Sequence, residues 1–246
     1  MRRFDFMPHS LLISDLHLSN DQPAGMAAFR RFVAGLATQA EALYILGDLF
    51  EYWAGDDDMH DPFHQQVIAA LRGLADQGTK LYLLHGNRDL LMGGDLAKAC
   101  HATLLDDPVL IDLYGTPTLL SHGDTLCTGD AAYQHFRAQV HDANFQRQFL
   151  AKPLAERKAW IAQLRERSTS EKQTKDSAIM DVSDAAVAGL LREYRYPRLI
   201  HGHTHRPGRH EHVVDGRRCE RWVLGDWHQQ GSALHCDAEK CRTVEF

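Results

Sequence analysis

Short apolar runs alternate with amphipathic stretches over the first hundred residues of the chain. Residues 42–46 are five consecutive apolar side chains followed by a glycine, which predicts a strand buried on both faces. Residues 11–14 and 81–84 predict two more strands of this kind. Between them, apolar residues recur every three or four positions, which predicts one helix after Pro23 and another that is closed by Gly78. This alternation is typical of a parallel α/β sheet.

The second half of the chain follows a different pattern. Residues 109–111 and 118–120 predict a hairpin, and Asp215-Gly216 has the composition of a type I′ turn in a second hairpin. The residues between about 128 and 196 contain only helical patterns. The sequence therefore predicts a single α/β domain over residues 1–246, with a helical cap inserted at about 128–196.

Composition and charge exclude several classes of protein. With 44% hydrophobic residues the chain can bury a large core, which excludes a disordered protein. Its net charge of −6 shows no basic excess, so we expect no nucleic-acid partner. Because no apolar run approaches the length of a membrane span or signal peptide, we expect a cytoplasmic protein. Peripheral association with a membrane surface stays open.

The cysteines give an expectation about redox state. The chain has five of them and no C-x-x-C motif. An odd number without paired spacing is typical of reduced, buried thiols rather than of a disulfide framework. We therefore expect reduced, mostly structural thiols.

Candidate chemistry gathers where five of the predicted strands end, the last of them a further strand predicted at residues 198–200. Each strand is followed by one or two polar side chains, and most of these adjoin a glycine that would let the backbone turn sharply. Open α/β sheets place their ligands at this edge of the sheet. The residues concerned are Asp15, His17, Asp48, Asn87, His122, His203 and His205.

These seven side chains predict a metal centre. Asp-x-His and His-x-His would place both side chains of an extended segment on one side, so that each pair could hold one ion. Seven nitrogen and oxygen ligands without cysteine are too many for one zinc ion and suit two ions that share a carboxylate. Two ions about 3.5–4 Å apart stabilise both the attacking and the leaving oxygen in displacement at phosphorus. The alternative for any single residue is a solvated loop group or a hydrogen-bonded histidine.

With these motifs the sequence resembles the calcineurin-like metallophosphoesterases, whose signature is D-x-H, G-D, G-N-H-D/E, H and G-H-x-H. The resemblance extends from Leu11 to Trp227. It implies a four-layer αββα sandwich of two sheets flanked by helices, with a helical cap and two metal ions at one edge. It also implies that one ion is held by Asp15, His17, Asp48 and His205, and the other by Asp48, Asn87, His122 and His203.

The chain departs from this signature at Arg88, where the family usually has a histidine assigned as general acid. An arginine cannot donate a proton, because its pKa lies above about 12. A phosphate leaving group, with a second pKa near ~6, needs no proton. Arg88 therefore favours cleavage of a pyrophosphate, whose oxygens its guanidinium would hold. The alternative is a surface salt bridge between Arg88 and Asp89.

Longer strings, at residues 85–89, 122–128, 178–182 and 201–207, resemble the UDP-2,3-diacylglucosamine pyrophosphatases of the lipid A pathway. This resemblance implies hydrolysis of UDP-2,3-diacylglucosamine to UMP and 2,3-diacylglucosamine 1-phosphate. Water activated by two Mn²⁺ ions would attack the phosphorus on the uridine side. The implied catalytic residues are Asp48, Asn87 and Arg88, and the implied substrate contacts are Asn87, Arg88, Asp130, Ser168, Lys172, Lys175 and His203. Lys172 is a second departure, since related sequences often carry a neutral polar residue there.

The inserted segment between Arg147 and Lys175 is locally basic and interleaved with apolar residues. Its eight Lys/Arg and three Glu give a balance of +5. One interpretation is a cationic, amphipathic cap that receives acyl chains and lies against anionic lipid on the cytoplasmic face of the inner membrane. The other is an ordinary helical hairpin whose charges face water.

Two further functions compete with this interpretation. One is a metallophosphoesterase that acts on soluble nucleotides or phosphodiesters. The other is a binding scaffold that has kept the fold and lost catalysis, although all seven ligand positions are filled here. Asp, Asn and His ligands suit Mn²⁺, Fe²⁺ or Zn²⁺ equally well, so the sequence leaves the physiological metal open. We expect a monomer.

Overall fold

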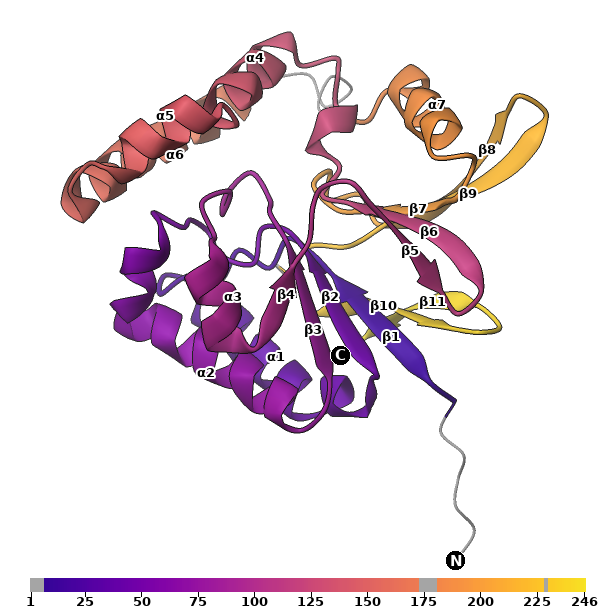
Figure 1. Cartoon of the computed structure of the whole chain (residues 1–246), viewed down its shortest axis with the longest axis horizontal. Helices are drawn as coiled ribbons and strands as arrows, with labels where there is room; N and C mark the ends of the chain where they lie inside the picture. Colours follow the sequence, from indigo (N-terminus) through magenta and orange to yellow (C-terminus); the bar gives the residue numbers. More distant parts are fainter. Residues whose placement is uncertain (1–6, 173–180, 228–229) are drawn as a thin grey trace, which may run out of the picture.

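The computed structural model describes residues 7–172, 181–227 and 230–246, with side chains throughout except at residues 167–172. Its centre is a pair of β-sheets. The first has the strand order β11-β10-β1-β2-β3-β4, and the second the order β5-β6-β7-β9-β8. Figure 1 shows the two sheets face to face, with helices on the outer side of each.

The first sheet is built from the apolar runs of the N-terminal half. Its strands β1 (His9–Ile13), β2 (Ala42–Leu46), β3 (Lys80–Leu84) and β4 (Ala102–Leu104) are parallel. Strands β10 (Ser232–Asp237) and β11 (Cys241–Glu245) extend the sheet in antiparallel fashion. Because β2 lies between two parallel neighbours and is covered on both faces, its run of apolar residues is almost fully buried, as predicted.

Three helices cover the outer face of this sheet: α1 (Pro23–Ala34), α2 (Pro62–Asp76) and α3 (Gly94–Cys100). Their apolar stripes, which include Phe29 and Leu71, pack against Leu11 and Leu43 of the strands in one large core. Proline lies in the first turn of both α1 and α2. Gly78 follows α2 with a φ of 106°, a conformation that suits glycine, so the predicted end of this helix is confirmed.

The second sheet is built from hairpins. Its strands are β5 (Val109–Leu113), β6 (Thr116–Ser121), β7 (Arg198–His201), β8 (Gly208–Val214) and β9 (Arg217–Val223). The predicted Asp215-Gly216 turn joins β8 to β9 with positive φ at both residues. Leu12, Ile200 and other apolar residues fill the space between the two sheets.

Helix α7 (Asp184–Glu193) packs on the outer face of the second sheet through Val187 and Leu191. The layers therefore follow the order helix, sheet, sheet, helix, which confirms the predicted four-layer sandwich. Helices α4 (Ala131–Val140), α5 (Ala143–Leu150) and α6 (Leu154–Lys172) form a separate group, which we call the cap. Figure 1 shows the cap apart from α7 and from the helices of the first sheet.

Basic residues of α6 fasten the cap to the loop that follows β2. Arg157 is only 2% exposed, and its guanidinium donates to Ala54 O and pairs with Asp57. Lys158 Nζ lies 2.6 Å from the buried Asp58 carboxylate. The side chains of Arg157 and Lys158 therefore face the rest of the domain. Of the two arrangements that the sequence left open for the basic residues of this segment, against lipid or in water, these two residues adopt neither.

The described residues contain no helix that is both long and apolar enough to cross a membrane. They do contain a disulfide, between Cys236 and Cys241, so the expectation of reduced thiols is wrong for this pair. The two residues lie opposite each other in the β10–β11 hairpin with their Cα atoms 4.2 Å apart, a proximity that the spacing of cysteines along the chain does not reveal. Cys100, Cys127 and Cys219 are free and buried, as expected.

Replacing the buried Arg157 tests how the cap is fastened. Arg157→Ala removes hydrogen bonds to Ala54 O, Asp57 and the backbone oxygen of Lys152 and leaves a cavity, so we expect the free energy of unfolding to fall by about 2 kcal/mol. Denaturant unfolding measures this change. Lys152→Ala, in the same cap but at an exposed side chain, is the matched control and should change it by less than about 0.5 kcal/mol. Equal stability of the two variants would contradict the fastening role.

Candidate metal centre

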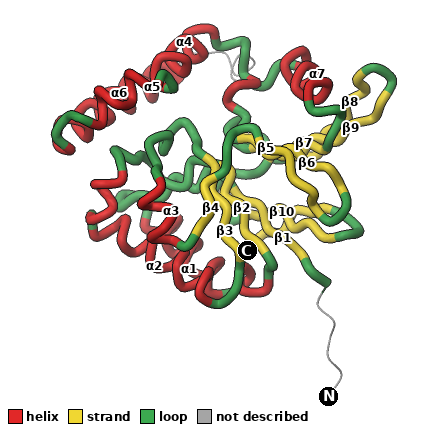
Figure 2. The backbone as a smooth tube through the Cα atoms, in the orientation of Figure 1, coloured by secondary structure: helices red, strands yellow, loops and turns green. Residues whose placement is uncertain are grey.

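The carboxyl ends of five strands meet at one edge of the sandwich. The loops after β1, β2 and β3 come from the first sheet, and those after β6 and β7 from the second. Figure 2 shows loops gathered between the upper ends of the sheets and the cap. Contacts among their side chains bring together all seven residues predicted from the sequence.

Asp15, His17 and His205 form a first group of facing side chains. The Nε2 atoms of the two imidazoles are 3.4 Å apart. His205 Nε2 is also 3.4 Å from Asp15 Oδ1. One ligand atom from each of the three residues lies within 4.8 Å of the others, which is close enough to hold a single ion.

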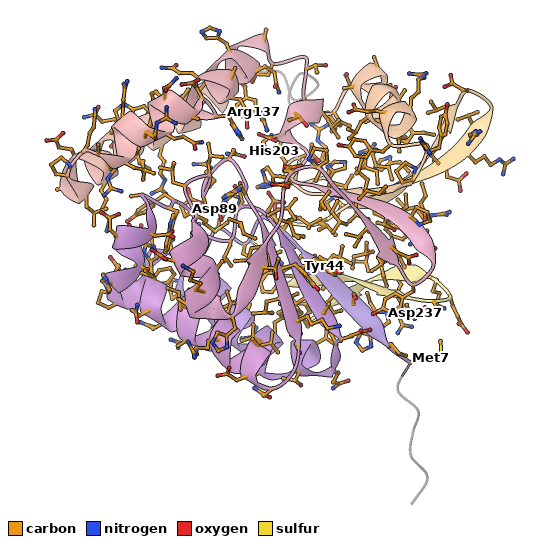
Figure 3. All side chains as sticks on the ribbon, in the orientation of Figure 1. Met7, Tyr44, Asp89, Arg137, His203 and Asp237 are labelled. Carbon is orange, nitrogen blue, oxygen red and sulfur yellow. A yellow bond between two sulfur atoms is a disulfide. The ribbon has the colours of Figure 1, made fainter. Side chains whose placement is uncertain are left out.

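Asn87, His122 and His203 form a second group. Asn87 Oδ1 lies 3.1 Å from His122 Nε2 and 2.9 Å from His203 Nδ1. The two imidazole nitrogens are 3.2 Å apart. Figure 3 labels His203 below the cap helices in this view.

Asp48 lies between the two groups. Its Oδ2 is 3.8 Å from His17 Nε2, and its Oδ1 is 3.9 Å from His122 Nε2. The carboxylate is almost fully buried, and Arg88 N donates to Oδ1 at 2.8 Å. A carboxylate with one oxygen toward each group has the geometry of a bridging ligand. Asp15, Asp48 and His122 also lie within reach of one ion, so the two groups are contiguous.

The donor set fits bound cations. Asp15 Oδ1 is buried, and its partner is His205 Nε2, 3.4 Å away. Burial alone would lower the pKa of His122, but the carboxylates of Asp48 and Asp15 outweigh it and raise this pKa to about 9. The pKa of His205 is raised to about 9 by Asp15 and Asp226, again against the effect of burial. The clustered, desolvated carboxylates therefore produce a negative electrostatic potential that stabilises positive charge at this site.

The reason given above for the histidine pairs is wrong, although the residues are correctly placed. Asp15, His17, His203 and His205 all have φ between 49° and 68°, so neither pair lies on an extended segment. The alternation of a strand therefore does not apply. His203 and His205 fall in different groups, as the family resemblance implied and strand alternation did not.

Two glycines are needed here because a side chain would clash with a neighbouring carboxylate, and not because the backbone turns sharply at them. A Cβ on Gly86 would lie 2.1 Å from Asp48 Oδ1, and one on Gly202 would lie 2.3 Å from Asp15 Oδ2. Neither residue has a positive φ. The absence of a side chain at these positions lets the carboxylates sit directly against the backbone of the neighbouring loop.

Asp89 holds two loops of the site together, although the sequence motifs did not single it out for this role. Its fully buried carboxylate accepts four backbone N–H groups, from Asp48 (3.2 Å), Leu49 (2.7 Å), Phe50 (3.2 Å) and Gly86 (2.9 Å). Burial and the nearby Asp48 charge raise its pKa to about 6. Asp89 thus ties the loop after β2 to the loop after β3. Its place in the G-N-x-D string was the available signal.

Glu51 and Asp226 were also missed, and no motif marks either of them. Glu51 Oε2 lies 3.1 Å from His17 Nδ1, and Asp226 Oδ2 lies 3.0 Å from His205 Nδ1. In each case the carboxylate contacts the ring nitrogen that faces away from the group of ligands. Such contacts orient the ring and make it a better ligand.

Arg88 does not form the salt bridge with Asp89 that was considered as an alternative. Asp89 is occupied by backbone amides, whereas Arg88 Nη1 lies 3.5 Å from Glu51 Oε1. The Arg88 side chain lines a cavity of about 580 Å³ between the metal centre and the cap. Asp48, Asn87 and His203 line its floor. Its walls are largely apolar and include Phe136, Phe145, Phe149, Trp160, Ile161 and Leu164.

The predicted cap contacts are only partly described. Asp130 lines the cavity, and its carboxylate also caps α4 by accepting Tyr133 N at 3.0 Å. Ser168 and Lys172 lie in α6, but their side chains are outside the described part of the chain, as is all of Lys175. Residues 178–180 of the 178–182 string also lie outside it.

The raised histidine pKa values predict proton release on metal binding. In the metal-free protein at pH 7, His122 and His205 are both protonated, because each pKa is about 9. A cation binds only the neutral imidazole, so Mn²⁺ uptake should release about two protons at pH 7 and none well above pH ~9. Apparent affinity should therefore rise between these pH values. Calorimetry in two buffers of different ionisation enthalpy counts the protons, and equal heats in both at pH 7 would contradict the prediction.

Comparison with known proteins supports the interpretation of this geometry. The family described as calcineurin-like phosphoesterase matches residues 9–207. A UDP-2,3-diacylglucosamine hydrolase of Aromatoleum aromaticum is 54% identical, with 93% of each chain covered. An enzyme of the same name from Escherichia coli O81 is 46% identical over 96% of this chain and 98% of its own length.

A solved structure agrees at the level of the fold. A dimetal phosphatase from Danio rerio superposes with a TM-score of 0.50 at 12% identity, covering 98% of this chain and 99% of its own. The family match spans all of the strand-end loops that form the candidate metal centre. With its fold, its ligand cluster and its relatives in agreement, the chain belongs to the calcineurin-like phosphoesterases and, within them, to the UDP-2,3-diacylglucosamine hydrolase family.

Proposed function

We propose that this protein hydrolyses the pyrophosphate bond of UDP-2,3-diacylglucosamine, giving UMP and 2,3-diacylglucosamine 1-phosphate. The observation that carries the proposal is a cavity that is polar on the side of the candidate metal centre and apolar on the side of the cap. Its floor presents Asp48, Asn87 and Arg88, while α4, α5 and α6 line it with aromatic and aliphatic side chains. A substrate that joins a charged diphosphate to apolar chains matches this division.

The relatives support the same substrate. Two proteins named UDP-2,3-diacylglucosamine hydrolase match nearly the full length of the chain, cap included. A phosphoesterase for soluble nucleotides would gain nothing from an apolar chamber beside its metal centre. The filled set of seven ligands likewise opposes a scaffold without catalytic activity.

The cofactor we propose is a pair of Mn²⁺ ions. Asp15, His17, Asp48 and His205 would hold one ion, and Asp48, Asn87, His122 and His203 the other. When bound, the cations supply Lewis acidity that activates water and neutralises phosphoryl charge. Iron and zinc suit the same nitrogen and oxygen ligands, so the choice of manganese rests on the family resemblance.

Arg88 would supply positive charge without proton transfer. Its backbone N–H fixes Asp48 Oδ1, while its side chain reaches the cavity beside Glu51. A guanidinium there would hold phosphoryl oxygens bidentately as charge develops on them. With water attacking the uridine-side phosphorus, the sugar phosphate leaves as a phosphate, which needs no general acid.

The cap would hold the acyl chains. Phe149 and Trp160 have ring centroids 4.9 Å apart, and both line the cavity with Leu164. We further propose that Asp130, Ser168, Lys172, Lys175 and His203 contact the polar part of the substrate. Because the substrate is a lipid, we propose that the protein works at the cytoplasmic face of the inner membrane. We also propose that it works as a monomer.

A substrate comparison tests the proposal directly. With Mn²⁺ present, kcat/KM should be at least about 100-fold higher for UDP-2,3-diacylglucosamine than for UDP-N-acetylglucosamine, because only the former buries acyl chains in the cavity. Mass spectrometry of the products should identify UMP and the lipid 1-phosphate, with label from ¹⁸O-water in UMP. Equal turnover of the two UDP-sugars would rule out the lipid substrate.

The bridging role of Asp48 predicts a severe loss of activity. Asp48→Ala removes the carboxylate that faces both ligand groups, so kcat should fall by at least about 10³-fold, equivalent to about 4 kcal/mol of transition-state stabilisation. Circular dichroism should show a folded protein. Asp21→Ala, at an exposed loop residue after β1, is the control and should retain activity. Near-normal turnover by Asp48→Ala would disprove the dinuclear mechanism.

A further inference from the structure

Glu51 lies where the metal centre, the cavity and the cap meet. It belongs to the loop after β2, three residues beyond Asp48, and its side chain is only 13% exposed. Each of its two carboxylate oxygens faces a different set of partners. One oxygen serves a metal-ligand candidate, and the other serves two arginines.

The first oxygen, Oε2, lies 3.1 Å from His17 Nδ1. The opposite nitrogen of the same ring, Nε2, faces His205 Nε2 at 3.4 Å and Asp48 Oδ2 at 3.8 Å. A carboxylate at Nδ1 keeps the proton on that nitrogen and leaves the Nε2 lone pair toward the metal centre. Glu51 therefore selects the ring form that can bind an ion.

The second oxygen, Oε1, brings together two guanidinium groups from different parts of the fold. Arg165 of α6 donates to it from Nε at 3.1 Å and approaches it with Nη2 at 2.9 Å. Arg88, from the loop after β3, approaches it with Nη1 at 3.5 Å. Two like charges repel, so an anion between them is needed to hold both at the same wall of the cavity.

We propose that Glu51 is a positioning residue for the reaction, which orients His17 for metal binding and holds Arg88 and Arg165 together as a guanidinium pair facing the substrate diphosphate. The second half of this inference rests on the proposed function, whereas the first half concerns metal binding alone. The Glu51 side chain thus contributes both to the docking of the cap, through Arg165, and to the assembly of the metal centre, through His17.

The role requires a carboxylate. A carboxylate accepts hydrogen bonds at both oxygens, whereas an amide accepts on one side and donates on the other. In Glu51→Gln, an amide oxygen toward the arginines would point N–H groups at the protonated Nδ1 of His17. The reverse orientation would point them at the guanidinium groups. Either way one set of contacts is lost.

The test compares three variants by two independent readouts. Isothermal titration with Mn²⁺ alone gives metal affinity, and steady-state kinetics at saturating Mn²⁺ gives kcat and KM for UDP-2,3-diacylglucosamine. Glu51→Gln should weaken Mn²⁺ binding by about 10-fold to 100-fold and raise KM by about tenfold. Arg165→Gln, which removes the cap-side contact to Glu51 and leaves the Glu51 contact to His17 in place, should raise KM and leave Mn²⁺ affinity unchanged.

Glu41→Gln is the matched control, because it makes the same chemical change at an exposed carboxylate before β2, at the opposite end of that strand. It should match the wild type in both readouts. Wild-type Mn²⁺ affinity in Glu51→Gln would overturn the first half of the proposal. Wild-type KM in both Glu51→Gln and Arg165→Gln would overturn the second. If the wild type fails to hydrolyse the acylated substrate, the proposed function falls, while the titration still decides the role at His17.

Discussion

The structure depends on the burial of negative charge at the edge where the two sheets meet. Asp15, Asp48, Asp89 and Asp124 are all nearly inaccessible to water, and burying a carboxylate without compensation is expensive. Each is compensated in its own way. Backbone amides surround Asp89, Arg137 Nε lies 2.7 Å from Asp124, and histidines surround Asp15 and Asp48. Cations bound between Asp15 and Asp48 would complete the compensation of these two charges. Metal binding would therefore also stabilise this edge of the fold.

Much of this architecture could be predicted from the sequence because local rules decide it. The apolar run of β2, the proline at the start of α1, and the glycine after α2 each determine local structure without reference to the rest of the chain. The metal ligands were predictable for a related reason. They follow directly after strands, and within each of the two sheets the carboxyl ends of the parallel strands lie at the same edge.

What could not be predicted depends on contacts between distant segments. Glu51 is one acidic residue among many until the fold places it beside His17 and Arg165. The basic residues of α6 suggested a surface for lipid or water, yet Arg157 is buried because Ala54 and Asp57 lie opposite it. The split of His203 from His205 depends on positive φ angles, which the residue types do not indicate, so only the family resemblance implied it. The disulfide depends on hairpin register.

The loop between β2 and α2 has a consequence for how such an enzyme could change its substrate. Within a few residues it carries Asp48, Glu51 and the Ala54–Asp58 segment that fastens the cap. A cap transplanted from another family member would therefore meet a mismatched docking surface unless this loop came with it. Exchanging the loop would in turn disturb the metal centre. Cap and catalytic domain are thus not separable modules, and new specificity is more accessible through point changes lining the cavity than by exchange of the cap.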